Sequence, residues 1–310
     1  MNNTVSPLVT IAIPTYNRAD GHLKEALESA LRQTYTNTEI IVSDNCSTDD
    51  TEKVVRSFFD KRIRYFRHEK NIGANNNFNF CLNNARGDFF LLLCDDDMID
   101  PDFVEICMRA DCHGTDVGII RTGTRIIDTN GNVLSKRSNR VDGLSTTDFF
   151  IGWFTGKTSL YLCSTLFNTD RLKEIGGFKS KTNLFQDVVA EVQLAAKYGR
   201  VDIYDVKASF RRHPENMGSA SKTTEWSEDC LYLLDLMSDL VSEDEDLIRQ
   251  KGMPFLCRKV YLQARNIESP ITRFLTYFSM YKKFDYSYSP FHFIWSRNLK
   301  RLATYFKNRM

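Results

Sequence analysis

The sequence predicts an α/β fold with a mainly parallel sheet near the N-terminus and a helical region at the C-terminus. As far as Cys94, short apolar runs typical of buried strands alternate with segments of helical periodicity. This alternation indicates βαβ units, which build parallel sheets. From Glu225 onwards the pattern is helical. At 310 residues the chain is long enough for one large α/β domain and a smaller appendage.

Each element follows from its own pattern. The apolar run from Val9 to Ile13 predicts a strand that Pro14 ends, and apolar residues three and four positions apart predict a helix from His22 to Gln33. The same reasoning gives strands at 39–43, 63–67, 88–94 and 201–206 and helices at 49–59, 78–85 and 185–198. Asn130-Gly131 lies between two apolar runs, 119–127 and 133–136, and therefore predicts a hairpin.

Composition argues against several classes of protein. No stretch approaches the roughly 18 apolar residues of a membrane-spanning helix. The N-terminus is polar and leads straight into a strand, so a signal peptide is not expected. The eight cysteines form no CxxC pair, which favours reduced thiols in a cytoplasmic protein over a disulfide or zinc framework.

Polar segments follow three of the predicted strands. These segments are 14–18, 44–49 and 95–97. Ligands of open α/β sheets bind outside the carboxyl ends of the strands, so all three segments are expected to converge on one crevice.

Asp95-Asp96-Asp97 is the sharpest of these features. Adjacent carboxylates repel one another unless a cation lies among them, and Mg²⁺ or Mn²⁺ bound by carboxylates keeps positions open for phosphate oxygens. The alternative is a solvated acidic turn. Asp44 has a similar pair of interpretations, since it could accept a hydrogen bond from a nucleobase or belong to a turn that caps the next helix.

Seven segments in order resemble the motifs of family 2 glycosyltransferases. They are residues 14–18, 42–49, 71–73 with Asn79, 94–97, 175–178, 186–187 and 212–219, so that the resemblance covers about 8 to 220. It implies a GT-A-type, Rossmann-like mixed sheet flanked by helices, in a catalytic domain at 1–220. The helical pattern and the composition of the rest predict a helical, basic and aromatic C-terminal extension at 221–310.

The resemblance further implies roles for single residues in binding the nucleotide. Residues of the first motif would line the base and ribose pocket, Asp44 and Asn45 would hold the base, commonly uracil, and two asparagines would help to close the nucleotide site. The complete set of nucleotide-binding residues is Pro14, Thr15, Tyr16, Asn17, Arg18, Asp44, Asn45, Asn77, Asn79 and Asp95.

Metal binding and catalysis are assigned in the same way. Asp96 would be the principal ligand of Mn²⁺ or Mg²⁺, with Asp97 and His213 completing the set, and Asp187 would be the general base that deprotonates the acceptor. Asp187 could instead be an ordinary first-turn acid of a helix.

Two departures from the family pattern stand out. Gln186 replaces the first residue of the usual acidic pair, and Asn45 replaces the second aspartate of the nucleoside motif. Arg211 and Arg212 could contact phosphates or simply lie in solvent.

The predicted function is glycosyl transfer from an NDP-sugar, expected to be a UDP-sugar, to an acceptor hydroxyl in cell-surface polysaccharide or glycoconjugate synthesis. With one base and no covalent nucleophile, a single displacement with inversion is expected. The alternatives are an inactive binding or scaffold subunit and a sugar nucleotidyltransferase. The latter would carry a glycine-rich phosphate loop where this chain has residues 14–18.

The C-terminal region is basic and aromatic. Residues 251–310 hold twelve Lys/Arg against two acids, Glu268 and Asp285, together with many aromatic residues. This composition predicts peripheral contact with the inner face of a membrane, where a saccharide or lipid-linked saccharide acceptor would be found. The alternative is a helical appendage that packs on the catalytic domain. Nucleic-acid binding is not expected, because no recognition motif accompanies the charge.

Overall fold

The computed structural model describes residues 6–19, 21–110, 117–212 and 223–296. Among them, residues 6–179 and 186–212 form one compact unit, and residues 180–185 and 223–296 form a second. The two units are described in turn.

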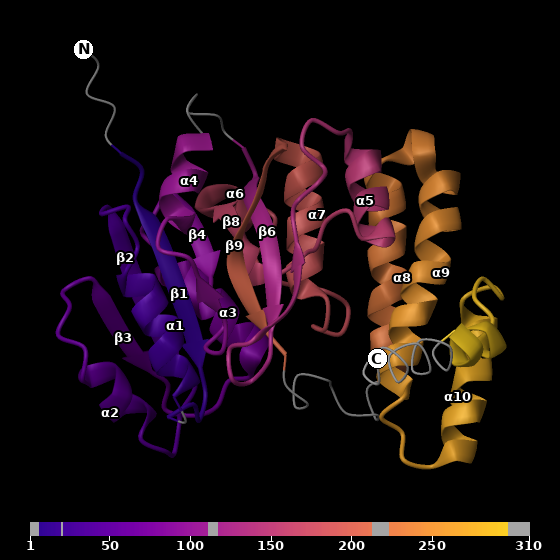
Figure 1. The fold of residues 1–310 in the computed structure, drawn as a ribbon, viewed down its shortest axis with the longest axis horizontal. Helices are drawn as coiled ribbons and strands as arrows, with labels where there is room; N and C mark the ends of the chain where they lie inside the picture. The colour runs from indigo at the N-terminus through magenta and orange to yellow at the C-terminus, as the bar shows by residue number, and fades with distance from the viewer. Residues whose placement is uncertain (1–5, 20, 111–116, 213–222, 297–310) are drawn as a thin grey trace, which may run out of the picture. The chain divides into compact units, whose positions relative to one another are not determined.

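A mixed sheet forms the centre of the first unit (Figure 1). The strands found among the described residues are β1 (Val9–Thr15), β2 (Thr38–Asp44), β3 (Ile63–Arg67), β4 (Phe89–Leu92), β5 (Met98–Ile99), β6 (Ile119–Ile127), β7 (Val133–Arg137), β8 (Thr165–Asn168) and β9 (Arg200–Arg211). Their order is β3-β2-β1-β4-β8-β6-β9-β5, with β7 paired to β6. Strands β3, β2, β1 and β4 run parallel, whereas β8 is antiparallel to both of its neighbours. The predicted mixed sheet is therefore confirmed.

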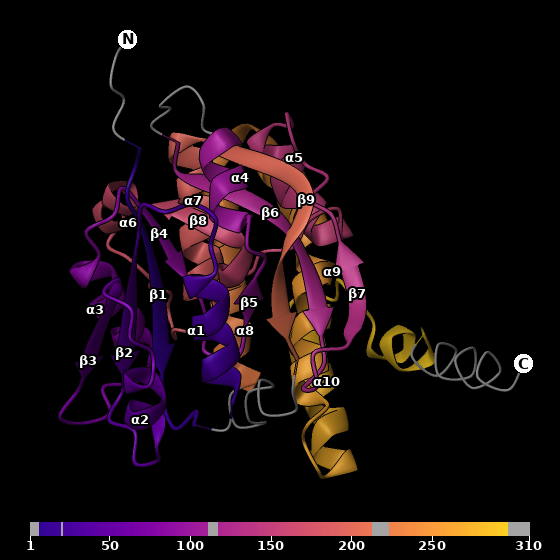
Figure 2. The ribbon, with the colours of Figure 1, turned by 60° about the vertical axis from the view of Figure 1, so that its left-hand side comes forward.

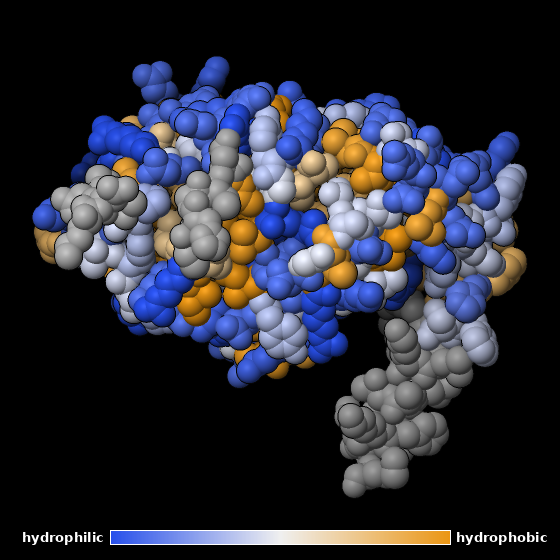
Figure 3. All heavy atoms as spheres, turned by 90° about the horizontal axis from the view of Figure 1, so that it is seen from above, coloured by the Kyte–Doolittle hydropathy of each residue, from blue (hydrophilic) through white to orange (hydrophobic). Residues whose placement is uncertain are grey.

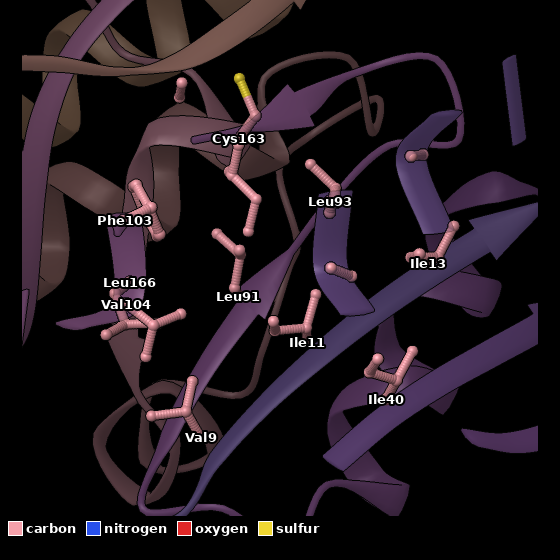
Figure 4. Close-up of a cluster of buried hydrophobic side chains, with 14 of the residues drawn as sticks. Val9, Ile11, Ile13, Ile40, Leu91, Leu93, Phe103, Val104, Cys163 and Leu166 are labelled. Carbon is pink, nitrogen blue, oxygen red and sulfur yellow. The ribbon is translucent and has the colours of Figure 1, made fainter. Parts of the chain in front are cut away.

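Helices cover both faces of this sheet (Figure 2). One face carries α1 (His22–Leu31), α2 (Thr51–Arg56) and α4 (Phe103–Ala110), whose apolar residues share a core with β1, β2 and β4. Figure 4 shows that core, in which Ile11, Leu91 and Phe103 lie together. The other face carries α3 (Ala74–Asn84), α6 (Thr169–Glu174) and α7 (Gln186–Tyr198). The remaining helices of the unit are α5 (Thr146–Thr155) and the 3₁₀ turn η1 (Leu162–Ser164).

The parallel strands all end at the same edge of the sheet. Register pairs Thr15 of β1 with Asp44 of β2, so the segments after these two strands start side by side. Figure 3 looks onto the opposite edge, where the chain enters β1, and there mostly hydrophilic residues surround small apolar groups.

The second unit is helical. Its elements are α8 (Thr223–Leu240), η4 (Ser242–Asp244), α9 (Glu245–Ala264), α10 (Pro270–Lys283) and a further helical turn at 290–296. Cys230, Leu234 and Met237 of α8 are fully buried, as are Leu256 and Val260 of α9. Within the described residues, no helix combines the length and apolarity needed to cross a membrane. The seven described cysteines are free thiols.

Candidate active site at the carboxyl ends of the strands

The acidic turn, residues 95–97, directly follows β4. Its first turn is closed by the Asp97 amide, which donates to the Cys94 carbonyl oxygen at 3.1 Å. Asp96 and Asp97 are 8% and 1% exposed, and the Asp95 side chain is 14% exposed. Three adjacent carboxylates are thus held close to the protein interior, which rules out the alternative of a freely solvated turn.

Burial and mutual repulsion shift the titration of this turn. Burial, reinforced by the neighbouring Asp96 charge, raises the pKa of Asp95 to about 7. The same two causes raise the pKa of Asp97 well above its ordinary value. Arg18 supplies a counter-charge, since its Nε lies 3.6 Å from Asp95 Oδ1. The ionised form of the turn is therefore disfavoured in the protein alone, and a bound cation would stabilise it.

The donor set suits a hard divalent cation. Cys94, Asp96 and Asp97 each offer a ligand atom, and these atoms all lie within 4.8 Å of one another. Burial and the surrounding carboxylates raise the pKa of the Cys94 thiol well above its ordinary value, so this sulfur stays protonated and is a poor ligand. Carboxylate oxygens remain, and these are what Mg²⁺ and Mn²⁺ prefer.

Asp97 also has a structural partner. Its Oδ1 accepts a hydrogen bond from the Arg211 amide at 2.8 Å. The bond from Arg211 holds the acidic turn against the end of β9, and the ligand roles of Asp96 and Asp97 stay predictions.

Arg211 corrects the expectation that it contacts phosphate or lies in solvent. It is 1% exposed, its Nε donates to the Asp96 carbonyl oxygen at 2.8 Å, and its guanidinium pairs with Glu25 of α1. This arginine instead fixes the acidic turn between β9 and α1. A single Arg at the end of a strand offers no sequence signal for this role. Arg212, beside it, is exposed.

The segments after β1 and β2 are bonded to each other. Asn17 Oδ1 accepts from the Thr48 amide at 2.8 Å, and the Asn17 amide donates to Ser47 Oγ at 2.9 Å. Asn17 adopts φ 53°, a left-handed conformation that asparagine tolerates better than most residues. The structure therefore brings residues 14–18 and 44–49 together, with Tyr16 45% exposed beside them.

Asp44 and Asn45 are buried and already hydrogen-bonded. Asp44 accepts from the Ser47 amide at 2.8 Å and from the Tyr65 hydroxyl at 2.7 Å. Asn45 Oδ1 accepts from the Ile72 amide at 2.8 Å, and its Nδ2 donates to Asn71 at 2.9 Å. Contact of either residue with a base stays a prediction.

The two asparagines of α3 hold neighbouring parts of the protein. Asn77 is 2% exposed and brackets Ser43 of β2, accepting from its hydroxyl at 2.6 Å and donating to its carbonyl oxygen at 3.0 Å. Asn79 brackets the backbone of Phe178 in the same way, with both bonds at 2.9 Å. These contacts give Asn77 and Asn79 a scaffolding role, and their part in closing the nucleotide site stays a prediction.

Asp187 lies in the first turn of α7 and is half-buried. The Asp187 charge contributes to the raised pKa of the Cys94 thiol, next to the acidic turn. It also contributes to the raised pKa of Glu191. Beside Asp187, Gln186 Oε1 is buried, and among the described residues it has no hydrogen-bond partner. His213 lies outside the described residues.

A buried ionic cluster behind Asp187 was not predicted. Arg121 is fully buried, and it pairs with Glu191 at 3.3 Å and with Asp202 at 3.2 Å. Burial raises the pKa of Glu191 to about 8, against the lowering effect of Arg121. The only available signal was an arginine inside the apolar run 119–127.

The chain is similar to known glycosyltransferases in sequence. The family model described as "Glycosyl transferase family 2" matches residues 10–173. An uncharacterized glycosyltransferase of Rickettsia conorii is 32% identical over 271 residues, which is 82% of this chain and 42% of that protein. The chain thus spans less than half the length of this relative.

Two solved structures share the fold. S. aureus TarS 1–349 matches with a TM-score of 0.65 and 18% identity, covering 89% of this chain and 80% of that one. The same protein has been solved with UDP-GlcNAc. The mannosyltransferase PcManGT from Pyrobaculum calidifontis, in complex with GDP-Man and Mn²⁺, matches with a TM-score of 0.55 and 17% identity, covering 96% and 88%. At such identities these likenesses establish the fold alone.

Proposed function

The chain belongs to glycosyltransferase family 2, and from this premise we propose that it transfers a sugar from a nucleotide-sugar donor to an acceptor hydroxyl with the help of Mn²⁺ or Mg²⁺. The observation that carries the proposal is the buried acidic turn beside the joined segments after β1 and β2. Solved relatives of the same fold bind UDP-GlcNAc in one case and GDP-Man with Mn²⁺ in another, which supports both the donor class and the metal.

The joined segments 14–18 and 44–49 would receive the nucleoside. Exposed Tyr16 offers a ring on which a base can stack, and Asp44 and Asn45 offer acceptors and a donor at the end of β2. The proposed base is uracil. The family pattern has an aspartate where this chain has Asn45, so this residue is the one that would change the preference to another base.

The acidic turn would hold the metal through Asp96, with Asp97 beside it. Bound there, a divalent cation supplies electrostatic stabilisation for the charge that develops on the leaving diphosphate. The chain's own part is to fix these carboxylates in place, which Arg211 does through its bonds to the Asp96 carbonyl oxygen and the Asp97 carboxylate.

Asp187 would act as general base. Its carboxylate would take the proton of the acceptor hydroxyl as that oxygen attacks the anomeric carbon and the bond to the diphosphate breaks. One base and one displacement give inversion at the anomeric carbon. The acceptor is proposed to be a saccharide or lipid-linked saccharide, met at the cytoplasmic face of a membrane during the synthesis of surface polysaccharide or glycoconjugate.

Thermal stability tests the donor site directly. The midpoint of unfolding is measured with UDP, GDP, dTDP and CDP, each with and without Mn²⁺, for the natural protein, Asp96→Asn and the control Asp205→Asn. Asp205 is an exposed acid on β9 of the same unit. Ligand that binds the folded state raises the midpoint. We expect a Mn²⁺-dependent rise with one nucleotide, retained in Asp205→Asn and lost in Asp96→Asn.

The contrary outcome is equally clear. If no nucleotide raises the midpoint with or without Mn²⁺, the chain is a GT-A-like binding or scaffold subunit without a donor site. A rise that survives in Asp96→Asn would place the metal elsewhere and overturn the role given to the acidic turn.

A further inference from the structure

Helix α10 has two apolar faces, and only one of them is covered within its unit. Tyr277 and Met280 are each 5% exposed, and the Tyr277 ring lies 5.1 Å from that of Tyr261 on α9. On the other face, Ile271, Phe274 and Leu275 are 75%, 44% and 63% exposed. A helix that packs on its neighbour needs the first face alone, so the second requires its own explanation.

The helical turn at 290–296 extends the uncovered face. The Phe278 ring contacts Phe274 at 4.8 Å between centroids and Phe291 at 5.5 Å, so it links the two helices. Phe291 and Trp295 are 63% and 62% exposed. We define the aromatic patch of the second unit as Ile271, Phe274, Leu275, Phe278, Phe291 and Trp295.

Packing beneath this patch holds its two halves together. Phe293, between Phe291 and Trp295, is 2% exposed, and its ring lies 5.2 Å from Tyr261 and 5.7 Å from Tyr277. The outward positions of Phe291 and Trp295 are therefore set by the inward anchoring of Phe293, and the exposed rings do not result from a loose end of the chain.

The charge around the patch decides what could cover it. From Ser269 to Met310 the sequence holds eight Lys/Arg and a single acid, Asp285. Three of these basic residues, Arg273, Lys282 and Lys283, lie on α10, and the other five lie outside the described residues. Lys282 is exposed one helical turn after Phe278, at the end of the patch. Basic residues that border exposed Trp, Phe and Leu are the composition of a surface that rests in the headgroup region of an anionic bilayer.

We infer that the aromatic patch of the second unit is a docking surface for an anionic lipid membrane, with its rings at the level of the acyl boundary and Lys282 among the headgroups. The inference rests on the proposed function only for its biological purpose, which is that docking would keep the enzyme beside a membrane-held acceptor. Binding to lipid itself needs neither donor nor metal, so it is tested separately.

Vesicle flotation of the full chain provides the test. Vesicles of phosphatidylcholine alone are compared with vesicles containing phosphatidylglycerol, at low and high salt. The proteins are the natural chain, the variant Ile271→Ser/Phe274→Ser/Trp295→Ser, and the control Phe59→Ser/Tyr204→Ser, which removes rings that are 101% and 59% exposed in the first unit. A separate variant, Lys282→Glu, reverses one charge and leaves the apolar residues intact.

We expect the natural chain and the control to float with anionic vesicles, more strongly at low salt. The triple variant should partition at least about tenfold less, because it removes three exposed apolar side chains. Lys282→Glu should bind more weakly only to the anionic vesicles. Trp295 should report insertion as a blue shift of fluorescence that the triple variant lacks.

Three results would overturn the inference: no flotation of the natural chain, equal flotation of the triple variant, or a patch-dependent dimer in light scattering without vesicle binding. Circular dichroism shows whether the triple variant is folded, and Lys282→Glu tests the surface if it is not. The nucleotide-induced rise in unfolding midpoint, measured on the same variants, separates failure of docking from failure of the donor site.

Discussion

At the scale of single residues, the role of Asp187 separates an enzyme from a binding protein. We expect Asp187→Asn to lower kcat by roughly 10²- to 10⁴-fold, because an amide cannot take the acceptor proton. Donor binding should be unchanged. Steady-state transfer and the nucleotide-induced thermal shift measure the two effects.

Asp170→Asn is the matched control for this variant. Asp170 is likewise an acid in the first turn of a helix, α6, and is exposed. If Asp187 only complements a helix dipole, both variants lose a similar small stability and neither loses activity. Equal kcat values in the two variants would therefore remove Asp187 from the mechanism.

The buried Glu191 predicts a pH dependence of stability. Its pKa is about 8 in the folded protein and near the ordinary carboxyl value in the unfolded chain. Between these values the folded state holds one more proton, so stability is greatest below the unfolded pKa and declines as pH rises to about 8. The decline should be at most about 1.4 kcal/mol per pH unit.

Glu191→Gln should flatten this decline, since glutamine does not titrate and keeps a similar shape. Urea unfolding at pH 5, 6, 7 and 8 measures the slope in both proteins. The same steep slope in the variant would show that another group carries the pH dependence.

The sequence allowed part of the site to be predicted at this scale. The acidic turn could be found because three adjacent acids after an apolar strand have few explanations. Arg211 and Arg121 could not be assigned, because an arginine is buried only when its partners surround it. Those partners, such as Glu25 and Glu191, lie far away in the sequence.

At the scale of elements, hydrogen bonds between Asn79 of α3 and the backbone of Phe178 hold the turn after α6, and Gly177 leaves room for the Asn79 side chain. The φ of Gly177 is +74°, and a Cβ at this position would lie 2.3 Å from Asn79 Oδ1. We expect Gly177→Ala to lower the free energy of unfolding by about 2–4 kcal/mol, because strain and displacement of the Asn79 side chain add together.

Gly131→Ala isolates the strain in this comparison. Gly131 has φ +84°, and a Cβ there would meet nothing within 4 Å. That variant should lose only about 1–2 kcal/mol. If urea unfolding gives the same loss for both glycines, the bracket that Asn79 makes on Phe178 contributes nothing to stability.

Elements with strong local patterns were predicted well. The strand at 63–67 and the hairpin around Gly131 have nearly the expected bounds. The expected helix 49–59 is shorter, and β9 is longer than the expected strand 201–206. Strands β5 and β8 were not predicted, because they are short and gain their hydrogen bonds from β9, β4 and β6, which sequence order does not reveal.

At the scale of the whole molecule, the chain passes between its two compact units more than once. Residues 180–185 group with the C-terminal helices, whereas α7, which begins at Gln186, belongs to the first unit. The predicted domain boundary near residue 220 corresponds only to the last point at which the chain changes unit. We call residues 180–185 the excursion, because the chain enters the second unit there and returns to the first. A segment of six residues has no composition that would predict this, and its place depends on its hydrogen bonds to Asp229.

Asp229 holds this excursion within the second unit. It is fully buried on α8, and its carboxylate accepts from Ser180 Oγ at 2.6 Å and from the amides of Thr182, Leu184 and Phe185 at 2.7, 2.8 and 3.1 Å. We expect Asp229→Ala to lower the free energy of unfolding by about 3–5 kcal/mol, because four donors lose a charged acceptor.

Asp235→Ala provides the control on the same helix. Asp235 pairs with Arg249 at 2.9 Å, but its side chain is 58% exposed, so its loss should cost under about 1 kcal/mol. Urea unfolding ranks the two variants. Because residue 185 leads directly into the turn that carries Asp187, Asp229→Ala should also lower kcat while the nucleotide-induced thermal shift persists. Full activity in a measurably destabilised Asp229→Ala would show that the excursion serves stability alone.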